Sequence, residues 1–547
     1  MNKLSRLILY FIVVPLILCS VFPPSSVLAS ISFNEEYSSK GGADKIAILL
    51  TESFYFEICK RAEWLQYITD LESENFNVSV FTINISMPDN SNPTEIRRFL
   101  ASMRGLKGAI LIGDIPSACY ETELHGHHAF PTDLFYADFN GTWNDSDADG
   151  VYDSHTGDIG PEIWIGRLPV NKLGGYSASG RLVEYLAKNH AYRIGQISGI
   201  DHAKALSFLD CDAALSIPAP IFVDVLLNLF HSLYDKIYLD ILYPEVTPVS
   251  INAETTLETY EQKLRENYEW VFLSAHGDAD NHIIANNAEG QDFSYESVKN
   301  LEPKPLFYYF TACYGSNFEH DKPVNAAYIF HGNGLAVIGF SGLGTYINPE
   351  TLYTDLDNPR RNTLGDAYKN WHRNLKSYFL PLWPVDWIDE HYNGLTLLGD
   401  PTLSLDPPIP MIQSFGSARI FKGQSVSFQG VGGIREGDIT AYSWRSEIDG
   451  FLSDASNFTT DLLSTGGVSG SNYNNVHFKV RDDKGRWSSE AKATVKVVLP
   501  QLGGHVSGSS GQRLANIELV INPVGIHVFT NQYGVYQAEM PSIGNYS

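Results

Sequence analysis

The sequence predicts an α/β protein built on an open, mostly parallel sheet and followed by modules made of β-strands. Short apolar runs such as Lys45–Thr51 and Gly108–Ile112 are typical of strands that are buried on both faces. Segments with helical spacing of apolar residues, such as Pro93–Met103, alternate with these runs. This alternation favours parallel strands joined by helices. Beyond residue 407 the long helical patterns end and short alternating runs begin.

The first α/β block spans residues 45–195 and follows a polar linker at residues 31–44. Residues 113–160 of this block form a long polar segment rich in Gly, Asp and His. A loop of that length inside a compact domain is usually functional. The expected elements, in order, are a strand at Lys45–Thr51, a helical stretch at Phe56–Glu74, a strand at Asn77–Ile83, a helix at Pro93–Met103, strands at Gly108–Ile112 and Glu162–Ile165, and a helix at Leu173–Asn189.

The second α/β block spans residues 196–407 and ends near a proline-rich boundary at Pro407–Pro410. In open sheets of this kind the active groups lie at the carboxyl ends of the strands. The expected strands are Ala205–Leu209, Ile237–Leu239, Trp270–Leu273, Leu306–Phe310 and Ala336–Phe340.

Two β-rich modules are expected after this boundary. Residues 408–498 show alternating runs such as Ser425–Gln429, split by Gly, Asp and Ser, and predict an immunoglobulin-like β-sandwich. Residues 499–547 predict a second, smaller β-domain. The sequence stops at Gly544–Ser547, within a predicted strand, so we expect this domain to be truncated.

Composition excludes some classes of partner. The chain has 547 residues, of which 44% are apolar, so it can bury a large core. Its net charge is −25 with neutral histidines, which excludes a basic nucleic-acid footprint and disfavours anionic membranes. An acidic chain can instead hold hard cations such as Ca²⁺.

Residues 1–30 are expected to be an export signal. Lys3 and Arg6 precede an apolar run at Leu7–Val21, and small residues up to Ala29 suit a signal peptidase. A membrane anchor is the alternative, but the run is short of the roughly 20 residues needed and Pro15 interrupts it. We therefore expect an extracellular protein, secreted or held at the cell surface, with no membrane span after signal removal. Its four remaining cysteines are too few for a disulfide scaffold.

Two apolar strands of the second block end in reactive residues. Trp270–Leu273 leads into His276, and Leu306–Phe310 leads into Cys313. A thiol with a pKa of about 8.5 is mostly neutral at pH 7, and an adjacent imidazole raises its thiolate fraction. Gly277 lets the backbone approach a substrate carbonyl, so its N–H and that of Cys313 could form an oxyanion hole. The pattern therefore predicts a thiol nucleophile, Cys313, with His276 as its base.

An apolar strand into His276-Gly277, then another into Ala312-Cys313, resembles the caspase-like clan of cysteine peptidases. Further segments narrow the resemblance to the gingipain family: Thr132–Tyr136, Pro161–Pro169 and Gly394–Leu403. The resemblance covers roughly residues 45–407. It implies a caspase-like sheet in two subdomains, the second carrying the catalytic pair. It also implies a cysteine endopeptidase that cleaves protein or peptide substrates through a thioester acyl-enzyme.

Two features of this family do not carry over cleanly. Gingipains place an acidic residue before the His-bearing strand to orient the imidazole; Asp210 or Asp212 lies at about that place, and Asp210 is favoured. The trypsin-like members use a further acid just downstream to bind a basic P1 side chain. Here that stretch is Ala213–Pro218, which has no acid, so the P1 preference stays open.

The long polar segment carries a candidate Ca²⁺ loop. Carboxylates alternate at Asp145, Asp147 and Asp149, Gly150 follows, and the EF-hand pattern then takes the carbonyl of Val151 and the side chain of Asp153. Position 12 is Thr156 rather than Glu, and no helices are expected to flank the loop, so we predict a lone structural Ca²⁺ site that Asp158 could complete. The nearby run His125–His128 lacks the partners of a zinc site and is interpreted as flexible surface histidines.

The C-terminal modules resemble extracellular accessory domains. Tyr442–Ser446 and Phe478–Ser488 are similar to the polycystic-kidney-disease type of immunoglobulin-like domain, with Trp444 in its core. Gly504–Gly508 and Phe529–Tyr536 are similar to a carboxypeptidase-regulatory-like domain. Fold analogy then implies a cell-surface or matrix ligand, which the sequence does not identify.

Two other functions stay open at this point. The chain could be a non-catalytic, Ca²⁺-dependent adhesin or surface protein on a degenerate peptidase fold. It could also be a peptidase that only processes partner proteins during secretion. Retention of both His276 and Cys313 favours an enzyme, because a binding module has no need of the pair.

Overall fold

The computed structural model describes residues 31–547 with internal gaps. None of its described helices is long and apolar enough to cross a membrane. The residues outside the description are 40, 86–91, 125, 176, 198–200, 210–237, 243–255, 287–288, 346, 348, 350–351, 353–354, 357–362, 380–384, 406–407, 435–437, 467–471, 484, 486 and 489.

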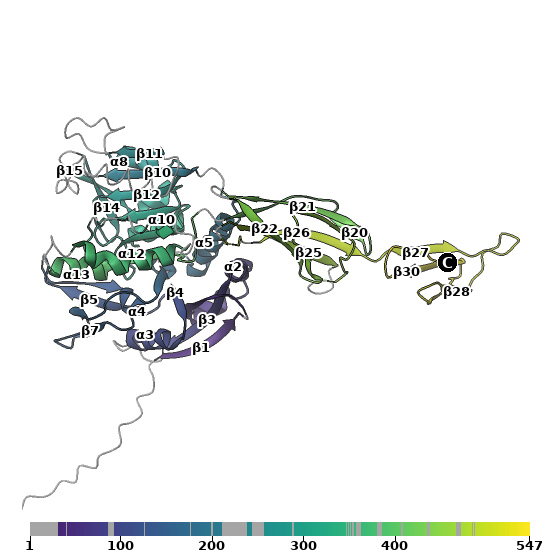
Figure 1. Ribbon diagram of the computed structural model, residues 1–547, viewed down its shortest axis with the longest axis horizontal. Helices are drawn as coiled ribbons and strands as arrows, with labels where there is room; N and C mark the ends of the chain where they lie inside the picture. Colours follow the sequence, from purple (N-terminus) through teal and green to yellow (C-terminus); the bar gives the residue numbers. More distant parts are fainter. Residues whose placement is uncertain are drawn as a thin grey trace, which may run out of the picture.

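One eleven-stranded sheet runs through the α/β body (Figure 1). All the pairs that join β2, β3, β4 and β9, and all those that join β10, β11, β12, β16 and β17, are parallel, which confirms the expected mostly parallel α/β sheet. Two pairs are antiparallel: β1 with β3, and β17 with β18. The sheet order is β1 (Ile31–Ser38), β3 (Phe76–Ile85), β2 (Asp44–Thr51), β4 (Leu106–Ile112), β9 (Trp164–Leu168), β18 (Leu395–Gly399), β17 (Ala336–Phe340), β16 (Phe307–Phe310), β12 (Tyr268–Ser274), β10 (Asp201–Leu209) and β11 (Tyr238–Leu242).

Helices and short ribbons surround this sheet. The helices are α1 (Glu52–Ile58), α2 (Ala62–Ser73), α3 (Asn92–Ser102), α4 (Leu134–Ala137), η1 (Val170–Lys172), α5 (Ala178–Arg193), α8 (Leu257–Leu264), α9 (Tyr295–Leu301), α10 (Val324–His331), α12 (Leu364–Phe379) and α13 (Val385–Gly394). The ribbons join β5 (Ala118–Thr122) to β6 (His128–Thr132), β7 (Thr142–Asn144) to β8 (Ser154–Thr156), and β13 (His276–Asp278) through β14 (Asn281–Asn286) to β15 (Glu289–Ser294).

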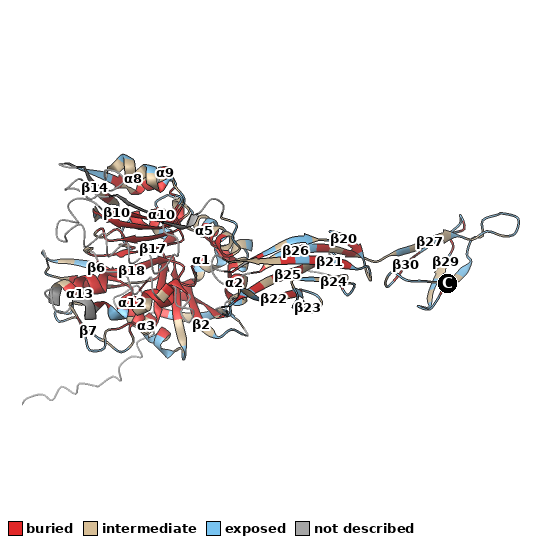
Figure 2. Cartoon of the chain, turned by 45° about the horizontal axis from the view of Figure 1, so that its top comes forward, coloured by how far each residue is buried: buried red, intermediate tan, exposed pale blue. Residues whose placement is uncertain are grey.

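Both faces of the sheet are buried. Successive residues of a strand point to opposite faces, and they enter two different apolar clusters. Tyr309 belongs to the cluster that contains Trp371 of α12, whereas Tyr308 belongs to the cluster that contains Tyr185 of α5. This double burial explains why the strands read as continuous apolar runs rather than alternating ones. Figure 2 shows the buried interior of this body.

Two sequence expectations differ from the observed elements. The expected linker at residues 31–44 contains β1, an edge strand that pairs with β3. The helical stretch at Phe56–Glu74 is two helices, because Arg61 is extended, with φ −73° and ψ 138°, between α1 and α2. Each helix buries its own apolar residues, so the periodicity continues across the break.

The β-strands after residue 408 form two groups (Figure 1). In the first group, Trp444 is fully buried in an apolar cluster with Phe428 and Phe478, as expected for a core aromatic. The first group holds a sheet of β19 (Ile409–Phe415), β21 (Val426–Gly433) and β24 (Asn457–Thr460), and a sheet of β20 (Arg419–Phe421), β26 (Ala491–Val498), β25 (Tyr473–Asp482), β22 (Ile439–Ser446) and β23 (Gly450–Ser453). The second group pairs β27 (Gln501–His505) with β30 (Val535–Glu539) and β28 (Glu518–Ile521) with β29 (Ile526–Phe529).

Candidate active site

His276 and Cys313 follow two strands that are neighbours in the sheet. β12 and β16 pair in parallel, with Leu273 opposite Phe310, so both chains leave the sheet at the same edge. The Thr311 amide still donates to the Leu273 carbonyl at 3.0 Å, which carries the pairing to within two residues of Cys313. The sheet therefore brings the two candidate residues to one place, as the sequence predicts for strand ends.

Gly277 marks the closest approach of these two chain segments. A Cβ atom at this position would lie 2.9 Å from the Cβ of Ala312 and 3.3 Å from the carbonyl oxygen of Cys313. It would also lie 3.0 Å from the carbonyl oxygen of Asn281. The absence of a side chain at Gly277 thus allows the His276 segment to lie against the Cys313 segment.

The thiol of Cys313 is half-buried and His276 is exposed. Burial raises the pKa of the Cys313 thiol, and the carboxylates of Glu390 and Asp278 raise it further. The Sγ atom lies 3.9 Å from the carbonyl oxygen of Gly344 and donates a weak hydrogen bond to it. A thiol in this environment needs a base before it can act as a nucleophile.

A tight turn carries the nucleophile. Tyr314 has a positive φ of 57°, and its amide donates to the carbonyl of Gly342 at 2.6 Å. A Cβ atom on Gly344 would lie 2.2 Å from the carbonyl oxygen of Thr311. The loop after β17 is therefore packed directly on the turn that holds Cys313.

Loops from the first half of the sheet reach the same edge. The Lys322 amide donates to the carbonyl of Lys172, which follows β9, at 2.7 Å. Ser117, which follows β4, donates to Glu319 at 2.8 Å. A cavity of about 190 Å³ lies between these loops and is lined in part by Phe318. The segment after Cys313 is thus braced by both halves of the sheet.

The segments that carry the family resemblance hold buried ion pairs. Arg167 donates to both carboxylate oxygens of Asp133, with Nη2 at 2.6 Å from Oδ1 and Nε at 2.9 Å from Oδ2. Arg193 donates from Nη2 to Oδ2 of Asp400 at 2.8 Å. All four side chains are nearly or fully buried. These ion pairs join strands and loops that are distant in the sequence.

The candidate Ca²⁺ loop lies between β7 and β8, and no helix flanks it, as expected. Its carboxylate oxygens form two groups, each within 4.8 Å: Asp145, Asp147 and Asp149, and Glu121 with Asp147 and Asp153. Glu121 lies on β5, which the loop joins through a hydrogen bond from the Glu121 amide to the Tyr152 carbonyl at 2.9 Å. Sequence reasoning missed Glu121 because its proximity depends on that pairing.

The loop is already ordered by its own hydrogen bonds. Asp145 accepts from the amides of Ala148 and Gly150, at 2.7 and 2.9 Å. Bonds from Ser146 lower the pKa of Asp153. Burial, and then the charges of Asp149 and its neighbours, raise the pKa of Glu121. Oxygen donors in this crowded acidic group fit a hard cation such as Ca²⁺.

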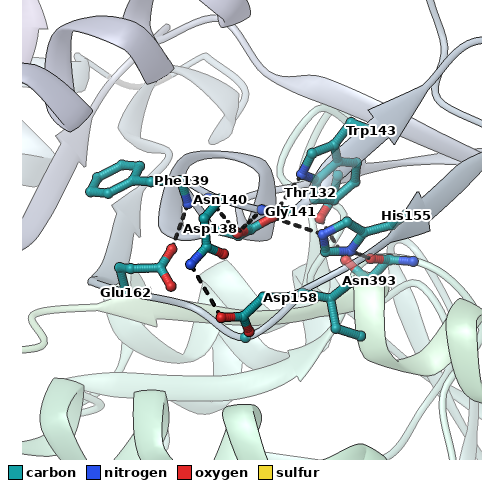
Figure 3. A network of polar contacts seen from close by, with 12 residues as sticks. Thr132, Asp138, Phe139, Asn140, Gly141, Trp143, His155, Asp158, Glu162 and Asn393 are labelled. Atoms are coloured by element: carbon teal, nitrogen blue, oxygen red, sulfur yellow. Dashed lines mark hydrogen bonds and ion pairs between the residues drawn. The ribbon is translucent and has the colours of Figure 1, made fainter.

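A buried network anchors the base of the same long loop (Figure 3). Asp138 accepts from Trp143 Nε1 at 3.0 Å and contacts His155 Nε2 at 2.8 Å, and His155 Nδ1 lies 3.0 Å from Asn393 Oδ1. Burial opposes ionisation, but these bonds outweigh it and lower the pKa of Asp138. Asp158, the candidate completing ligand, instead accepts from Asn140 at 3.2 Å.

The interpretation of His125–His128 as flexible surface histidines is wrong for His128. His127 is exposed, as expected, and His125 lies outside the described residues. His128 is not a free surface side chain, because its Nε2 lies 2.9 Å from the buried carboxylate of Glu390. This contact depends on the fold, which brings α13 against β6, because His128 and Glu390 are 262 positions apart in the sequence.

Some sequence-predicted positions are not described by the structure. The export signal at residues 1–30, the orienting candidates Asp210 and Asp212, and the stretch Ala213–Pro218 all lie outside the described residues.

This α/β fold, with a cysteine and a histidine after adjacent strands, is compatible with that of a caspase-like cysteine peptidase. The model of peptidase family C25 matches residues 39–406, so the chain belongs to that family, the gingipain family. A search of the curated proteins found no match.

Solved structures are similar at low sequence identity. One described as the structure of a protease is 13% identical, with a TM-score of 0.51, over 83% of this chain and 97% of that chain. The Saccharomyces cerevisiae separase–securin complex is 12% identical, with a TM-score of 0.28, over 44% of this chain and 14% of that chain. At these identities the first likeness shows the fold alone.

Proposed function

We propose that the chain is an exported cysteine endopeptidase in which Cys313 is the nucleophile and His276 its general base. The close approach of Gly277 to Ala312 and Cys313 is the observation that carries this proposal. It supports a caspase-like arrangement, in which the His-bearing and Cys-bearing strands of one sheet share an active edge.

The proposed reaction uses side chains and backbone amides at this edge and a water molecule. His276 takes the proton of the Cys313 thiol, and the thiolate attacks the scissile carbonyl. The amides of Gly277 and Cys313 stabilise the oxyanion, and the protonated His276 then delivers its proton to the leaving amine. Water, activated by His276, hydrolyses the thioester. Asp210 remains our candidate for orienting the imidazole.

The function is tested with a mixed peptide library, under reducing conditions with Ca²⁺. We expect cleavage by the wild-type protein and none above background by Cys313→Ala. Cys119→Ala is the matched control, because Cys119 is also a free, half-buried cysteine but lies on β5. Equal, negligible cleavage by wild type and Cys313→Ala would favour the non-catalytic surface protein. The cleaved bonds would also give the P1 preference.

We further propose that the acidic loop holds one structural Ca²⁺ ion. Asp145, Asp147, Asp149 and Asp153 would supply carboxylates, Val151 its carbonyl, and Glu121 a further oxygen from β5. The fit rests on the clustered oxygens. Burial, and then the repulsion of nearby carboxylates, raises the pKa of Glu121, so a bound cation would relieve this crowding. We expect EDTA to lower the melting temperature of the wild-type protein. Asp147→Asn should abolish this shift, whereas Asp158→Asn should keep it. No shift on chelation would contradict the site.

We also propose that the chain is exported and that its last two groups of strands are accessory modules. Trp444 in an apolar cluster shared by two sheets supports an immunoglobulin-like module of the polycystic-kidney-disease type. The small cluster around Ile521 and Met540 supports a second β-module, of the carboxypeptidase-regulatory-like type. Their proposed ligand is a cell-surface or matrix component. Pull-down of the full chain on matrix material, with and without Ca²⁺, tests this binding.

A further inference from the structure

A buried carboxylate supports the loop on which Cys313 rests. The Glu390 side chain on α13 is fully buried, and its Oε1 accepts from the Leu343 amide at 3.0 Å. The flanking residues Gly342 and Gly344 provide the carbonyls that accept from Tyr314 and from the Cys313 thiol. Glu390 thus holds the centre of the loop whose two neighbouring residues contact the nucleophile turn.

The same loop is clamped on both sides. The Ser341 hydroxyl donates to the carbonyl of Pro131 on β6 at 2.6 Å, and its amide donates to that of Gly394 at the end of α13 at 2.8 Å. A Cβ atom on Gly342 would lie 2.7 Å from the ring of Phe130. The loop therefore has little freedom once β6 and α13 are in place.

His128 on β6 completes this support. Its Nε2 lies 2.9 Å from Oε1 of Glu390, and its Nδ1 lies 2.7 Å from the carbonyl oxygen of Gly126. Both ring nitrogens therefore face acceptors, an arrangement that only the imidazolium satisfies. Burial opposes the charged ring, but these two bonds outweigh it and raise the pKa of His128.

Charge compensation matters here because Glu390 binds the loop that contacts the thiol. Burial raises the pKa of both Cys313 and Tyr314, and the charges of Glu390 and Asp278 raise both further. The other Glu390 oxygen, Oε2, is buried and has no hydrogen-bond partner among the described residues, so His128 is the cationic partner that the described part of the chain provides. Without a cation, Glu390 would oppose thiolate formation at Cys313.

We propose that Glu390 and His128 are positioning residues of the Cys313 site: Glu390 fixes the loop at Gly342–Gly344, and protonated His128 holds Glu390 and cancels its charge. This inference rests on the proposed peptidase function, because it assigns the pair a task in preparing the nucleophile. The groups that face the pair are Cys313, Tyr314 and, near His128, the exposed Glu123.

The proposal predicts shifts of opposite sign for two conservative substitutions. Glu390→Gln keeps an acceptor for Leu343 but removes a negative charge, so the pKa of the Cys313 thiol falls. His128→Gln keeps a donor to Glu390 but removes the positive charge, so the thiol pKa rises. In the Glu390→Gln background, His128→Gln should have little further effect, because its partner charge is gone.

The measurement is the pH dependence of Cys313 alkylation by iodoacetamide, followed by mass spectrometry of the cysteine peptides of the full chain. Below the thiol pKa we expect alkylation roughly 3- to 10-fold faster in Glu390→Gln and slower by a similar factor in His128→Gln. His127→Gln is the matched control and should leave the Cys313 profile unchanged. Cys119 supplies an internal reference in every sample.

Glu390→Asp separates charge from position. It keeps the negative charge but shortens the reach to Leu343, so kcat for peptide cleavage should fall while Cys313 alkylation is not accelerated. Shifts of the same sign in Glu390→Gln and His128→Gln, or no shift, would overturn the proposal. If Glu390→Gln fails to fold, His128→Gln alone decides, because slower alkylation supports the proposal and any other result contradicts it. Alkylation needs no turnover, so failure of the peptidase function would appear separately as an inactive wild type.

Discussion

At the scale of single residues, His276 and Cys313 owe their place at one edge of the sheet to the two strands that precede them. Each follows a strand, and neighbouring parallel strands bring their carboxyl ends to one edge. The strand pattern of the sequence did not predict which residues support the loop beside the thiol. His128 and Glu390 meet across 262 residues, so neither has a local signature. The sequence run at His125–His128 suggested only surface histidines.

Gly277 gives a direct test of the packing at the active edge. Gly277→Ala would force a Cβ atom to within 3.0 Å of Ala312 and Asn281, so neighbouring backbone must move. We expect a loss of about 1–3 kcal/mol in the free energy of unfolding and reduced peptidase activity. Gly180→Ala on α5 is the control, since its nearest neighbour would be 3.5 Å away and alanine favours a helix. Thermal unfolding and cleavage rates check both variants; an active, stable Gly277→Ala would contradict the close approach.

His282 should make the α/β body sensitive to acid. It is fully buried beside Phe310 and Tyr328, neither ring nitrogen has a hydrogen-bond partner in the described part of the chain, and burial lowers its pKa to about 3. Because the unfolded chain takes up this proton near pH 6.5, stability is lost as the pH falls from about 6.5 towards 3, by up to about 1.4 kcal/mol per pH unit. His282→Leu should flatten this slope in denaturant titrations. The exposed His320→Leu should not, and an unchanged slope in His282→Leu would refute the assignment.

At the scale of elements, the sequence predicted most strands because burial on both faces makes them continuous apolar runs. It did not predict β1, whose residues are mostly polar and exposed. An edge strand of this kind is held by its pairing with one neighbour, here β3, and so lacks the continuous apolar run of a buried strand. The split between α1 and α2 was also missed, since no Pro or Gly marks it. The sequence also did not predict what the segments of the family resemblance do: Asp133 and Arg167 form a buried ion pair that joins two of these segments.

The Asp133–Arg167 pair should therefore be needed for folding rather than for chemistry. Asp133→Asn leaves Arg167 buried without its counter-charge, and we expect a loss of about 3–5 kcal/mol in the free energy of unfolding. Glu63→Gln, which breaks the exposed contact to Arg61, should cost below about 1 kcal/mol. Chemical denaturation of both variants gives the comparison. A similar small loss in Asp133→Asn would show that the buried pair is dispensable.

At the scale of the whole molecule, the sequence predicted the succession of an α/β body and β-rich groups, because a change in periodicity is readable locally. The order of the strands was not readable. The pairing of β9 with β18 joins the two halves of the body into one sheet. Leu398 of β18 lies opposite Arg167 of β9, which is about 230 residues earlier in the chain. Such long-range pairing is decided by packing and leaves no trace in a local pattern.

The first β-rich group should lose stability in a more acidic range than the body. Arg445 pairs with Glu490 through two bonds of 2.8 and 2.9 Å, and His477 lies 2.9 Å from the same carboxylate. Burial opposes ionisation, but these partners outweigh it and lower the pKa of Glu490 to about 2. Its stabilisation is present above about pH 4.5 and is lost as the pH falls towards 2.

Hydrogen exchange of the amides in β22 and β25 measures this effect in the full chain. Glu490→Gln should speed exchange at pH 7, and the difference from wild type should shrink as the pH approaches 2. Glu518→Gln, which removes an exposed partner of His527, is the control and should leave these amides unchanged. A difference between Glu490→Gln and wild type that stays constant with pH would contradict the role of this carboxylate.

The central claim, a thiol nucleophile activated by its neighbouring histidine, is tested most directly by covalent capture. A peptide carrying an electrophilic ketone is incubated with the full chain, and the modified cysteine is identified by mass spectrometry. The account predicts an adduct on Cys313 rather than on Cys59 or Cys119, formed at least about 100-fold more slowly in His276→Ala. An adduct on another cysteine, or an equal rate in His276→Ala, would contradict it.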